Sequence, residues 1–360
     1  MRDRTRYRIL RAISYLPDRV KIRMSRTPAV IVDGQQLDPQ VQLIRSMRRA
    51  NAPGLVEPNV EAARKRYRRE TMAYRGPVTK VGEVRDLEIG PLAARLYEPK
   101  QETRDLTLYF HGGGFVLGDL DTHDEPCRIL CRYAGIRILS VAYRLAPENP
   151  FPAALDDAAA ALRWAQKNYQ RVSIGGDSAG ANLSAVICQE SRDHPPVAQL
   201  LIYPPTDGGP AWRSKELFSE GYFLSRKDRA AFGKYYGTPE AERVRDSPLR
   251  ASDLSNLPPA LVITAGFDIL RDEGEAYADA LRAAGNIVHM QRFPGLGHGF
   301  VHLTGICRAA RRAMIDIAQR WRNVNDYRHQ EHSNGTSRHG IGSTEQMGKQ
   351  GSKSGSNARS

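Results

Sequence analysis

Between about residue 80 and residue 322 the chain alternates short apolar segments with longer ones of helical composition. Strands that are separated by helices form a mostly parallel sheet that is buried on both faces. The predicted strands are VRDLEI, AARLYE, LTLYFH, RILSVAY, RVSIGG, AQLLIYP, ALVITAG and VHMQRF. The predicted helices cover residues 124–134, 153–168, 180–193, 273–284 and 304–322. We therefore expect an α/β fold with a mostly parallel eight-stranded sheet flanked by helices.

Three parts of the chain fall outside this alternation. Residues 1–75 are polar and helix-forming, as in DPQVQLIRSMRRA and NVEAARKRYRRETMAYR, which predicts a helical N-terminal segment. Residues 205–248 exceed an ordinary strand-to-helix connection, which predicts an inserted lid or part of a binding site. Residues 323–360 are rich in Ser, Gly, Asn, His and Gln, which predicts a disordered polar tail. Residues 76–322 then form the expected central domain.

The net charge of +13 is concentrated at the N-terminus. Residues 1–75 hold 18 Lys and Arg against 7 Asp and Glu, a net charge of +11, which leaves only +2 for the remainder. No helix-turn-helix, zinc finger or aromatic RNA-binding signature accompanies this charge, so we expect no nucleic-acid partner. We favour a solvated arginine-rich surface. The alternative is a weak membrane-surface contact through an amphipathic face of residues 4–16, made by Tyr7, Ile9, Leu10, Ile13 and Leu16.

Neither a membrane span nor a leader is expected. No run of about 18 apolar residues occurs, and arginines interrupt every apolar stretch of the N-terminal MRDRTRYRILRAISYLPDRVKIRM. The four cysteines, Cys127, Cys131, Cys188 and Cys307, lack metal-site spacing, so reduced structural thiols are the expectation. These features predict a cytoplasmic protein without a metal site.

The stretch SIGGDSAGAN at 173–182 contains a G-x-S-x-G pattern centred on Ser178. Ser178 lies between the predicted strand RVSIGG and a predicted helix, where a nucleophile elbow holds its serine. The helix would direct free N–H groups and its positive dipole end at this point. The same turn also suits a serine that merely caps the helix. A nucleophile additionally requires an acid, a base and oxyanion donors.

The acid and the base are expected after Ser178, in the order Ser, Asp or Glu, His. Asp268 directly follows the strand ALVITAGF, at the sheet edge of Ser178, although an N-cap of the next helix would also place an aspartate there. Asp272 is the nearest rival, but it falls on that helix. His298 lies in GLGHGF, a glycine-flanked loop after VHMQRF, and is the histidine with suitable order and setting. The others set aside are His289 in a strand, His302 at a helix start, and His329, His332 and His339 in the tail.

A glycine loop, HGGGF at 111–115, directly follows the strand LTLYF. Backbone N–H groups can stabilise the oxyanion of a tetrahedral intermediate only where no side chain blocks their approach, and glycines leave it open. The N–H of Ala179, next to the serine, would complete the oxyanion hole. A phosphate-binding loop is the alternative for such a turn, but the chain has no G-x-x-x-x-G-K-[ST] pattern.

Together these motifs resemble the hormone-sensitive-lipase-like family of bacterial esterases, which have the α/β-hydrolase fold with a helical cap. The motifs are HGGGF, YRLAPENPFPAALDDA, GGDSAGANL, DILRDEG and GHGF. GDSAG is similar to the subgroup with Asp before the nucleophile. The N-terminal 75 residues and the 205–248 insertion resemble the family's cap, so the resemblance covers nearly all of the chain except the tail.

The resemblance implies a role for each matching residue. Ser178 would be the nucleophile, His298 the general base and Asp268 the acid that orients it. Gly113, Gly114 and Ala179 would donate to the oxyanion, with Gly112 as a weaker candidate. His111 would hold the glycine loop, and Asp177 would support the elbow. Ile269 departs from the proline that the family often has after its triad aspartate.

We therefore expect a serine carboxylesterase that hydrolyses short- to medium-chain acyl esters without a cofactor. The alternatives are an amide or lactone hydrolase with the same triad, a non-catalytic binding protein on a hydrolase scaffold, and a lipase acting at an oil–water interface. The expected partner is a small-molecule ester, and a homodimer remains open.

Overall fold

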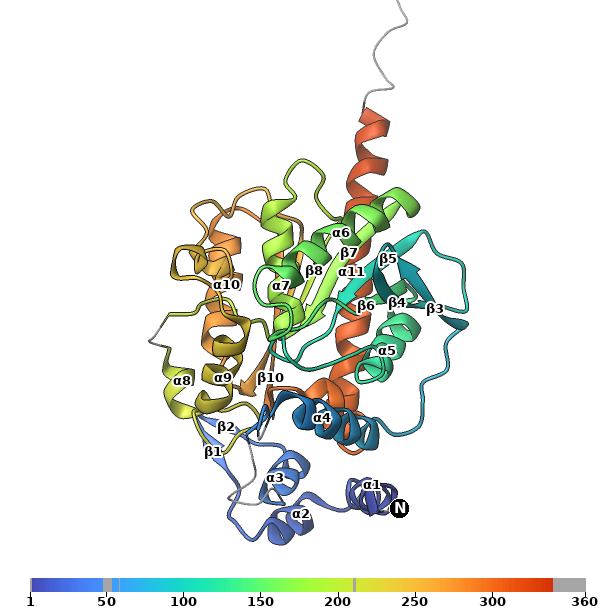
Figure 1. The fold of residues 1–360 in the computed structure, drawn as a ribbon. Coiled ribbons are helices and arrows are strands. Elements are labelled where there is room, and N and C mark those ends of the chain that lie inside the picture. The colour runs from blue at the N-terminus through green and yellow to red at the C-terminus, as the bar shows by residue number, and fades with distance from the viewer. Residues whose placement is uncertain (1, 48–53, 58, 210–211, 339–360) are drawn as a thin grey trace, which may run out of the picture. The chain divides into compact units, whose positions relative to one another are not determined.

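The computed structural model describes residues 2–47, 54–57, 59–209 and 212–338. Residues 1–325 form one compact unit, and residues 326–360 form a second. The first unit contains the sheet, its helices, the N-terminal segment and the insertion (Figure 1). None of the described helices combines the length and the apolar character needed to span a bilayer.

The centre of the first unit is an eight-stranded sheet with the order β10-β9-β8-β7-β5-β6-β4-β3. Strands β10 to β6 pair in parallel along this order, whereas β6–β4 and β4–β3 pair antiparallel. All eight predicted strands are present, with small shifts at their ends. Their bounds are β3 Glu83–Ile89, β4 Leu92–Glu98, β5 Asp105–Phe110, β6 Arg137–Val141, β7 Arg171–Asp177, β8 Gln199–Ile202, β9 Ala260–Phe267 and β10 Val288–Gly297.

Helices cover both faces of the sheet (Figure 1). On one face α5 and α11 meet, where the Arg322 guanidinium donates to the Ala134 carbonyl over 2.7 Å. On the other face α7 lies between α6 and α10, and Gln189 of α7 donates to the Tyr277 hydroxyl of α10 over 3.0 Å. The bounds are α5 Asp124–Ala134, α6 Ala153–Asn168, α7 Ala179–Glu190, α10 Arg271–Ala283 and α11 Arg308–Arg338, with a 3₁₀ turn at Phe300–Leu303.

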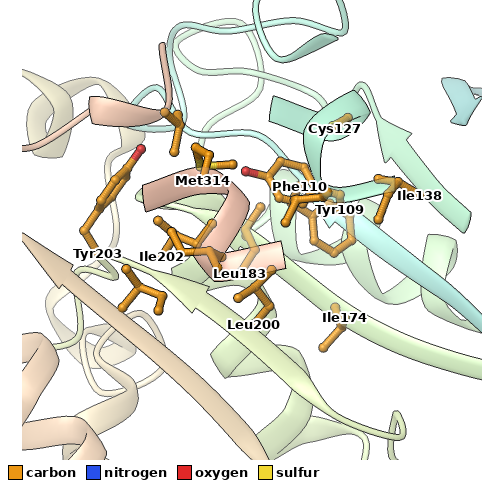
Figure 2. Packing of buried hydrophobic residues seen from close by; sticks show 14 of the residues in the cluster. Tyr109, Phe110, Cys127, Ile138, Ile174, Leu183, Leu200, Ile202, Tyr203 and Met314 are labelled. Atoms are coloured by element: carbon orange, nitrogen blue, oxygen red, sulfur yellow. The ribbon is translucent and has the colours of Figure 1, made fainter. Parts of the chain in front are cut away.

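The core is the apolar layer on either side of the central strands. Figure 2 shows part of this layer, including Ile174 of β7, Leu200 and Ile202 of β8, and residues of the neighbouring helices. Helix α7 is buried at every position from Ala179 to Cys188, so it is the central helix of its layer. Its small residues allow close approach to the sheet, and this fixes the point at which β7 turns into the helix.

The N-terminal segment is helical, as predicted, but it also contains a short hairpin. Strands β1 Ile31–Val32 and β2 Gln35–Gln36 pair around Asp33 and Gly34, whose φ angles are 56° and 72°. Asp-Gly favours this two-residue turn, so the signal for the hairpin was present in the sequence. The helices are α1 Arg2–Ile13, α2 Asp18–Ser25, α3 Pro39–Ser46 and α4 Val60–Tyr74. The predicted helical residues 48–50 lie outside the described residues.

The insertion at 205–248 carries its own helices. Helix α9 covers Arg226–Tyr236, the part predicted to be helical, and begins at a capping box between Ser225 and Asp228. The shorter elements are α8 Arg213–Leu217 and two 3₁₀ turns at Glu240–Glu242 and Pro248–Arg250.

The predicted start of the tail at residue 323 is wrong, because α11 continues to Arg338. Val324 and Asn325 are buried, and the Ser173 hydroxyl of β7 donates to the Asn325 side chain. Arg171 also donates to the Asn325 carbonyl over 2.8 Å. The polar composition of this segment therefore gave no sign that Val324 and Asn325 are buried against the rest of the domain. Residues 339–360 of the predicted tail lie outside the described residues.

Candidate active site

Ser178 occupies a strained turn between β7 and α7. Its φ and ψ angles are 51° and −121°, a conformation that non-glycine residues rarely adopt. The Ser178 amide donates to the Ile202 carbonyl of β8 over 2.8 Å, which holds the turn in place. A Cβ atom on Gly180 would collide with the Phe110 carbonyl, so glycine is needed there. Ser178 stands at the N-cap position, but its side chain makes no capping hydrogen bond.

The Ser178 side chain instead meets the predicted histidine. His298 Nε2 lies 2.9 Å from Ser178 Oγ, and His298 Nδ1 lies 2.8 Å from Asp268 Oδ2. The Asp268 side chain is fully buried, and that of His298 is 12% exposed. The structure thus brings together all three residues from the ends of β7, β9 and β10. The chain of contacts has the order that transfers a proton from a hydroxyl to an imidazole held by a carboxylate.

The rival assignments are placed elsewhere. The second carboxylate oxygen of Asp268 accepts the Leu270 amide over 2.9 Å, so the aspartate also shapes the turn before α10. Asp272 lies on α10 and accepts from the Ser214 amide and the Arg271 guanidinium, each over 2.7 Å. His289 is exposed on β10.

The glycine loop after β5 presents two amides beside this group. Gly113 and Gly114 have φ angles of 126° and 62°, and within the described residues their N–H groups have no acceptor. Gly112 differs, because its amide already donates to Asp177 Oδ1 over 3.0 Å. Ala179 is the first residue of α7, so its N–H has no intrahelical partner. Among the described residues, the amides of Gly113, Gly114 and Ala179 therefore have no acceptor, whereas that of Gly112 has one.

Asp177 connects the elbow to the glycine loop. Its carboxylate accepts from Gly112, from the Tyr109 hydroxyl at 2.9 Å and from the Tyr203 hydroxyl at 3.2 Å, and lies 3.2 Å from His123 Nε2. Burial alone would raise the pKa of Asp177, but His123 and Tyr109 outweigh it and hold the pKa below its usual range. Asp177 is therefore an anion at neutral pH that fixes the loop.

A cluster of buried histidines lies behind the loop. Burial lowers the pKa of His111 to about 4 and the pKa of His302 to about 3, so both rings are neutral near pH 7. His111 Nδ1 contacts the Gly112 carbonyl over 2.9 Å, and its own carbonyl accepts from the Tyr143 hydroxyl over 2.7 Å. His111 is thus placed where it can support the loop. His123 and His302 have no distinguishing signal in the sequence.

Three residues of this region are close enough together to be considered as metal ligands. Ligand atoms of His123, Asp177 and His302 lie within 4.8 Å of one another. However, the Gly112 amide points at both His123 Nε2, at 3.3 Å, and Asp177 Oδ1, at 3.0 Å. A cation bound there would displace this amide from the acceptors that hold the loop. The donor set therefore fits a hydrogen-bonded support better than a metal site.

Helix α4 of the N-terminal segment is fastened to the far side of the glycine loop. Arg64 donates to the Val116 carbonyl over 2.8 Å and to the Ala146 carbonyl over 2.9 Å, and it pairs with Glu148. Three residues further along, the Tyr67 hydroxyl lies 2.9 Å from His302 Nε2. On the same face Arg68 pairs with Asp119 and Asp121. Sequence reasoning missed these contacts, although 64, 67 and 68 share one helical face.

Ser178 and His298 open into a cavity of about 1530 Å³. The insertion supplies one wall, where the Phe115 ring stacks on Tyr236 of α9 with 3.9 Å between centroids. The Phe232 ring, also on α9, fills the space where Gly114 has no side chain. The cavity exceeds the roughly 300–1,000 Å³ of common ligand sites, so a small ester would occupy only part of it.

Known proteins share this sequence and fold. A family model described as the alpha/beta hydrolase fold matches residues 107–302. The carboxylic ester hydrolase LipN of Mycobacterium tuberculosis is 44% identical over 319 residues, which cover 82% of this chain and 85% of LipN. An ethyl acetate hydrolase of Pseudomonas putida is 36% identical over 245 residues, 63% of this chain and 77% of that protein.

The solved structures include an ester hydrolase, EH1AB1, from the metagenome of Lake Arreo. It superimposes with a TM-score of 0.74 at 37% identity, covering 80% of this chain and 96% of that one. The chain therefore belongs to the α/β hydrolase family and is an enzyme of the carboxylic ester hydrolase class.

Proposed function

We propose that this hydrolase is a serine esterase of the subgroup with GDSAG at the elbow, in which Ser178 is the nucleophile, His298 the general base and Asp268 its orienting acid. The observation that carries the proposal is the continuous contact from Ser178 Oγ to His298 Nε2 at 2.9 Å and from His298 Nδ1 to Asp268 at 2.8 Å. A buried carboxylate that accepts from Nδ1 leaves Nε2 free to accept the serine proton.

In the first half of the reaction Ser178 Oγ attacks the ester carbonyl while His298 takes its proton. The oxygen–carbon bond to the serine forms, and the tetrahedral intermediate collapses with loss of the alcohol, which takes that proton from His298. In the second half a water molecule, deprotonated by His298, attacks the acyl-enzyme. The carboxylic acid leaves, and the proton returns to Ser178.

The negative charge of each tetrahedral intermediate would be met by the amides of Gly113, Gly114 and Ala179. Losing one such donor costs roughly 100- to 1,000-fold in rate. The bond from the Gly112 amide to Asp177 supports this assignment, because it holds the loop without using the other two glycine amides.

The proposed substrates are short- to medium-chain acyl esters. The name of the Pseudomonas relative, an ethyl acetate hydrolase, supports the short end of this range. The cavity of about 1530 Å³ supports the longer end. An amide or a lactone would meet the same three residues. The preference for an ester over an amide is therefore measured by comparing rates on matched ester and amide substrates.

The experiment is a rate profile with p-nitrophenyl esters of two to about twelve carbons, for the wild-type protein and for Ser178→Ala. We expect the highest kcat/KM at short or medium chains and loss of activity in the variant, with unchanged circular dichroism. Activity that survives in Ser178→Ala would refute the serine mechanism. Tight ester binding without turnover would instead favour a binding protein.

Two further predictions concern the setting of the enzyme. We propose a cytoplasmic location, supported by four cysteines that are all free and buried. We also propose that nucleic acid is not a partner, because no helix-turn-helix, zinc finger or aromatic RNA-binding signature accompanies the basic charge in the sequence.

A further inference from the structure

Helix α2 is turned with its apolar side chains outward. Val20 and Met24 are 40% and 41% exposed, whereas Lys21 and Ser25 are only 7% and 4% exposed. The buried pair is satisfied by polar contacts, such as that of the Lys21 ammonium with Asp18 at 2.8 Å. A helix on the surface of a free-standing protein normally has the opposite arrangement. The exposed face of α2 is thus suited to meet something apolar.

The turn before α2 and the adjoining helix α1 extend this surface. Leu16, Val20 and Met24 recur every four residues and are all exposed, as are Tyr15 and Ile9. We call these five residues the apolar patch. The amphipathic face predicted from the sequence is only partly available, because Leu10 and Ile13 are buried in the body of the protein.

Arginines accompany the apolar patch in the same part of the chain. The exposed ones are Arg8, Arg11, Arg19, Arg23 and Arg26. Asp18, the acidic residue of this region whose side chain is described, is already paired with Lys21. On α2 the exposed arginines at 19 and 23 each precede a member of the apolar patch, so charge and apolar surface run side by side. The patch therefore has a strong positive charge around it.

We propose that α1 and α2 dock on the surface of a bilayer rich in anionic phospholipid. Side chains such as Leu16 and Met24 would enter the boundary between headgroups and acyl chains, while the arginines would meet the phosphates. A purely apolar partner would leave these arginines without counter-charges. Nucleic acid would leave the apolar patch in water. Anionic lipid matches both at once.

The position of the surface suits an enzyme that takes apolar esters. In Figure 1 α1 and α2 lie at the lower end of the first unit, near α3. The Gln42 side chain of α3 donates to the Ser25 hydroxyl of α2 over 2.9 Å. Ile44 of α3 and Met47, which directly follows the helix, line the cavity that holds Ser178. The advantage of docking near a source of apolar esters rests on the proposed esterase function, but the docking itself does not.

The experiment is sedimentation of the full chain with vesicles of phosphatidylcholine alone and of phosphatidylcholine with phosphatidylglycerol. We expect binding to the anionic vesicles that weakens with added salt and with neutral lipid. A Leu16→Ser, Val20→Ser, Met24→Ser variant should lower the partition coefficient about tenfold or more. Replacing Arg19 and Arg23 by Gln should lower it about fivefold per arginine.

Matched controls separate the patch from general surface effects. Val78→Ser with Met290→Ser removes two apolar side chains that are 43% and 39% exposed elsewhere, and should leave vesicle binding unchanged. All variants should keep the wild-type rate on soluble p-nitrophenyl butyrate, which also shows that they fold. This separates a failure of docking from a failure of the proposed chemistry.

Three outcomes would overturn the proposal. One is equal binding to neutral and anionic vesicles, or no binding to either. Another is a wild-type protein with the molar mass of a dimer in solution and a serine variant with that of a monomer. This result would assign the patch to a second copy of the chain. The third is binding to duplex DNA, at the strength seen with vesicles, that the glutamine variant abolishes and the serine variant retains.

Discussion

The catalytic edge of the sheet and the N-terminal segment treat polar groups in opposite ways. At the edge Asp177 and Asp268 are buried, and each is met by several donors at about hydrogen-bonding distance. In α1 and α2 the arginines whose side chains are described face water, and apolar side chains are exposed among them. The charged groups of the first region are buried and hydrogen-bonded, whereas those of the second are exposed to solvent.

The two regions gain their specificity in different ways. A buried carboxylate without its donors costs free energy, so the residues around Asp177 and Asp268 are fixed together. An exposed arginine costs little when its partner is absent, so α1 and α2 can wait for an external surface. Helix α4 belongs to both regions, because it lies in the N-terminal segment and fastens the glycine loop through Arg64.

After Ser178→Ala, which should lose activity, the largest expected effect at the catalytic edge is that of Asp268→Asn. The amide can no longer stabilise the protonated imidazole of His298, and it favours the wrong tautomer. We expect kcat on p-nitrophenyl butyrate to fall roughly 1,000- to 10,000-fold, with KM little changed. Asp272→Asn, on α10, is the matched control and should retain most activity. A loss of less than tenfold in Asp268→Asn would contradict the assignment of the acid.

Acid should destabilise the catalytic edge before the N-terminal segment, which contains no histidine. The pKa values of His111 and His302 are lowered to about 4 and about 3, so the unfolded chain takes up protons more readily. Stability is then complete above pH 6.5 and falls as the pH decreases towards 4. At pH 5.5 each histidine should remove about 1 to 1.5 kcal/mol from the free energy of unfolding.

Urea unfolding at pH 7.5, 6.5 and 5.5 measures this loss. Burial also raises the pKa of Glu125 and Glu273, so these two groups increase the free energy of unfolding as the pH falls. The quantity to compare between variants is therefore the slope of the free energy of unfolding against pH. His302→Asn removes one titrating ring and should flatten the dependence on pH. A variant as steep as the wild type would show that His302 does not carry the effect.

A smaller effect is expected when the charge of Asp177 is removed. In Asp177→Asn the Gly112 amide keeps an acceptor, but the Tyr203 hydroxyl loses the carboxylate oxygen to which it donates and the loop loses its anion. We expect kcat to fall roughly 10- to 100-fold with KM nearly unchanged, because the oxyanion donors are displaced rather than deleted. A purely structural role would lower the melting temperature and leave kcat per folded molecule intact.

The smallest loss is expected at the junction of the two regions. Arg64→Met should lower kcat roughly tenfold, because Val116 and Ala146 lose a shared donor and the glycine loop relaxes. Lys65→Met is the matched control on the same helix, where exposed Lys65 pairs with Glu61. Equal kcat for both variants would mean that α4 covers the loop without positioning it.

Most of the fold and the core of the site were predictable from local signals. Eight apolar segments separated by helices specify the strands, and strand ends with glycine specify where Ser178 and His298 must lie. The contacts of Asp268 with His298 span 30 residues, yet the order of the motifs predicts them because parallel strands share one edge. Chemistry that requires a fixed geometry leaves a pattern in the sequence.

The parts that could not be predicted depend on tertiary packing without a local signal. Arg64 is one of many arginines in its segment, and nothing in the sequence separates it from Lys65. Lys21 and Asn325 are buried, although their polar character predicts exposure. Asn325 was expected to lie in a disordered polar tail. The outward direction of Val20 and Met24 follows only from the way α2 packs on α3.

The most direct test of the account locates the covalent bond. Reaction with diethyl p-nitrophenyl phosphate should inactivate the enzyme and add one diethylphosphoryl group to the tryptic peptide between Arg171 and Arg192. Fragment masses should place the group on Ser178, and Ser178→Ala should remain unlabelled. A label on another serine of this peptide, or inactivation without any label on it, would contradict the claim that Ser178 is the nucleophile. The other serines of that peptide are Ser173, Ser184 and Ser191.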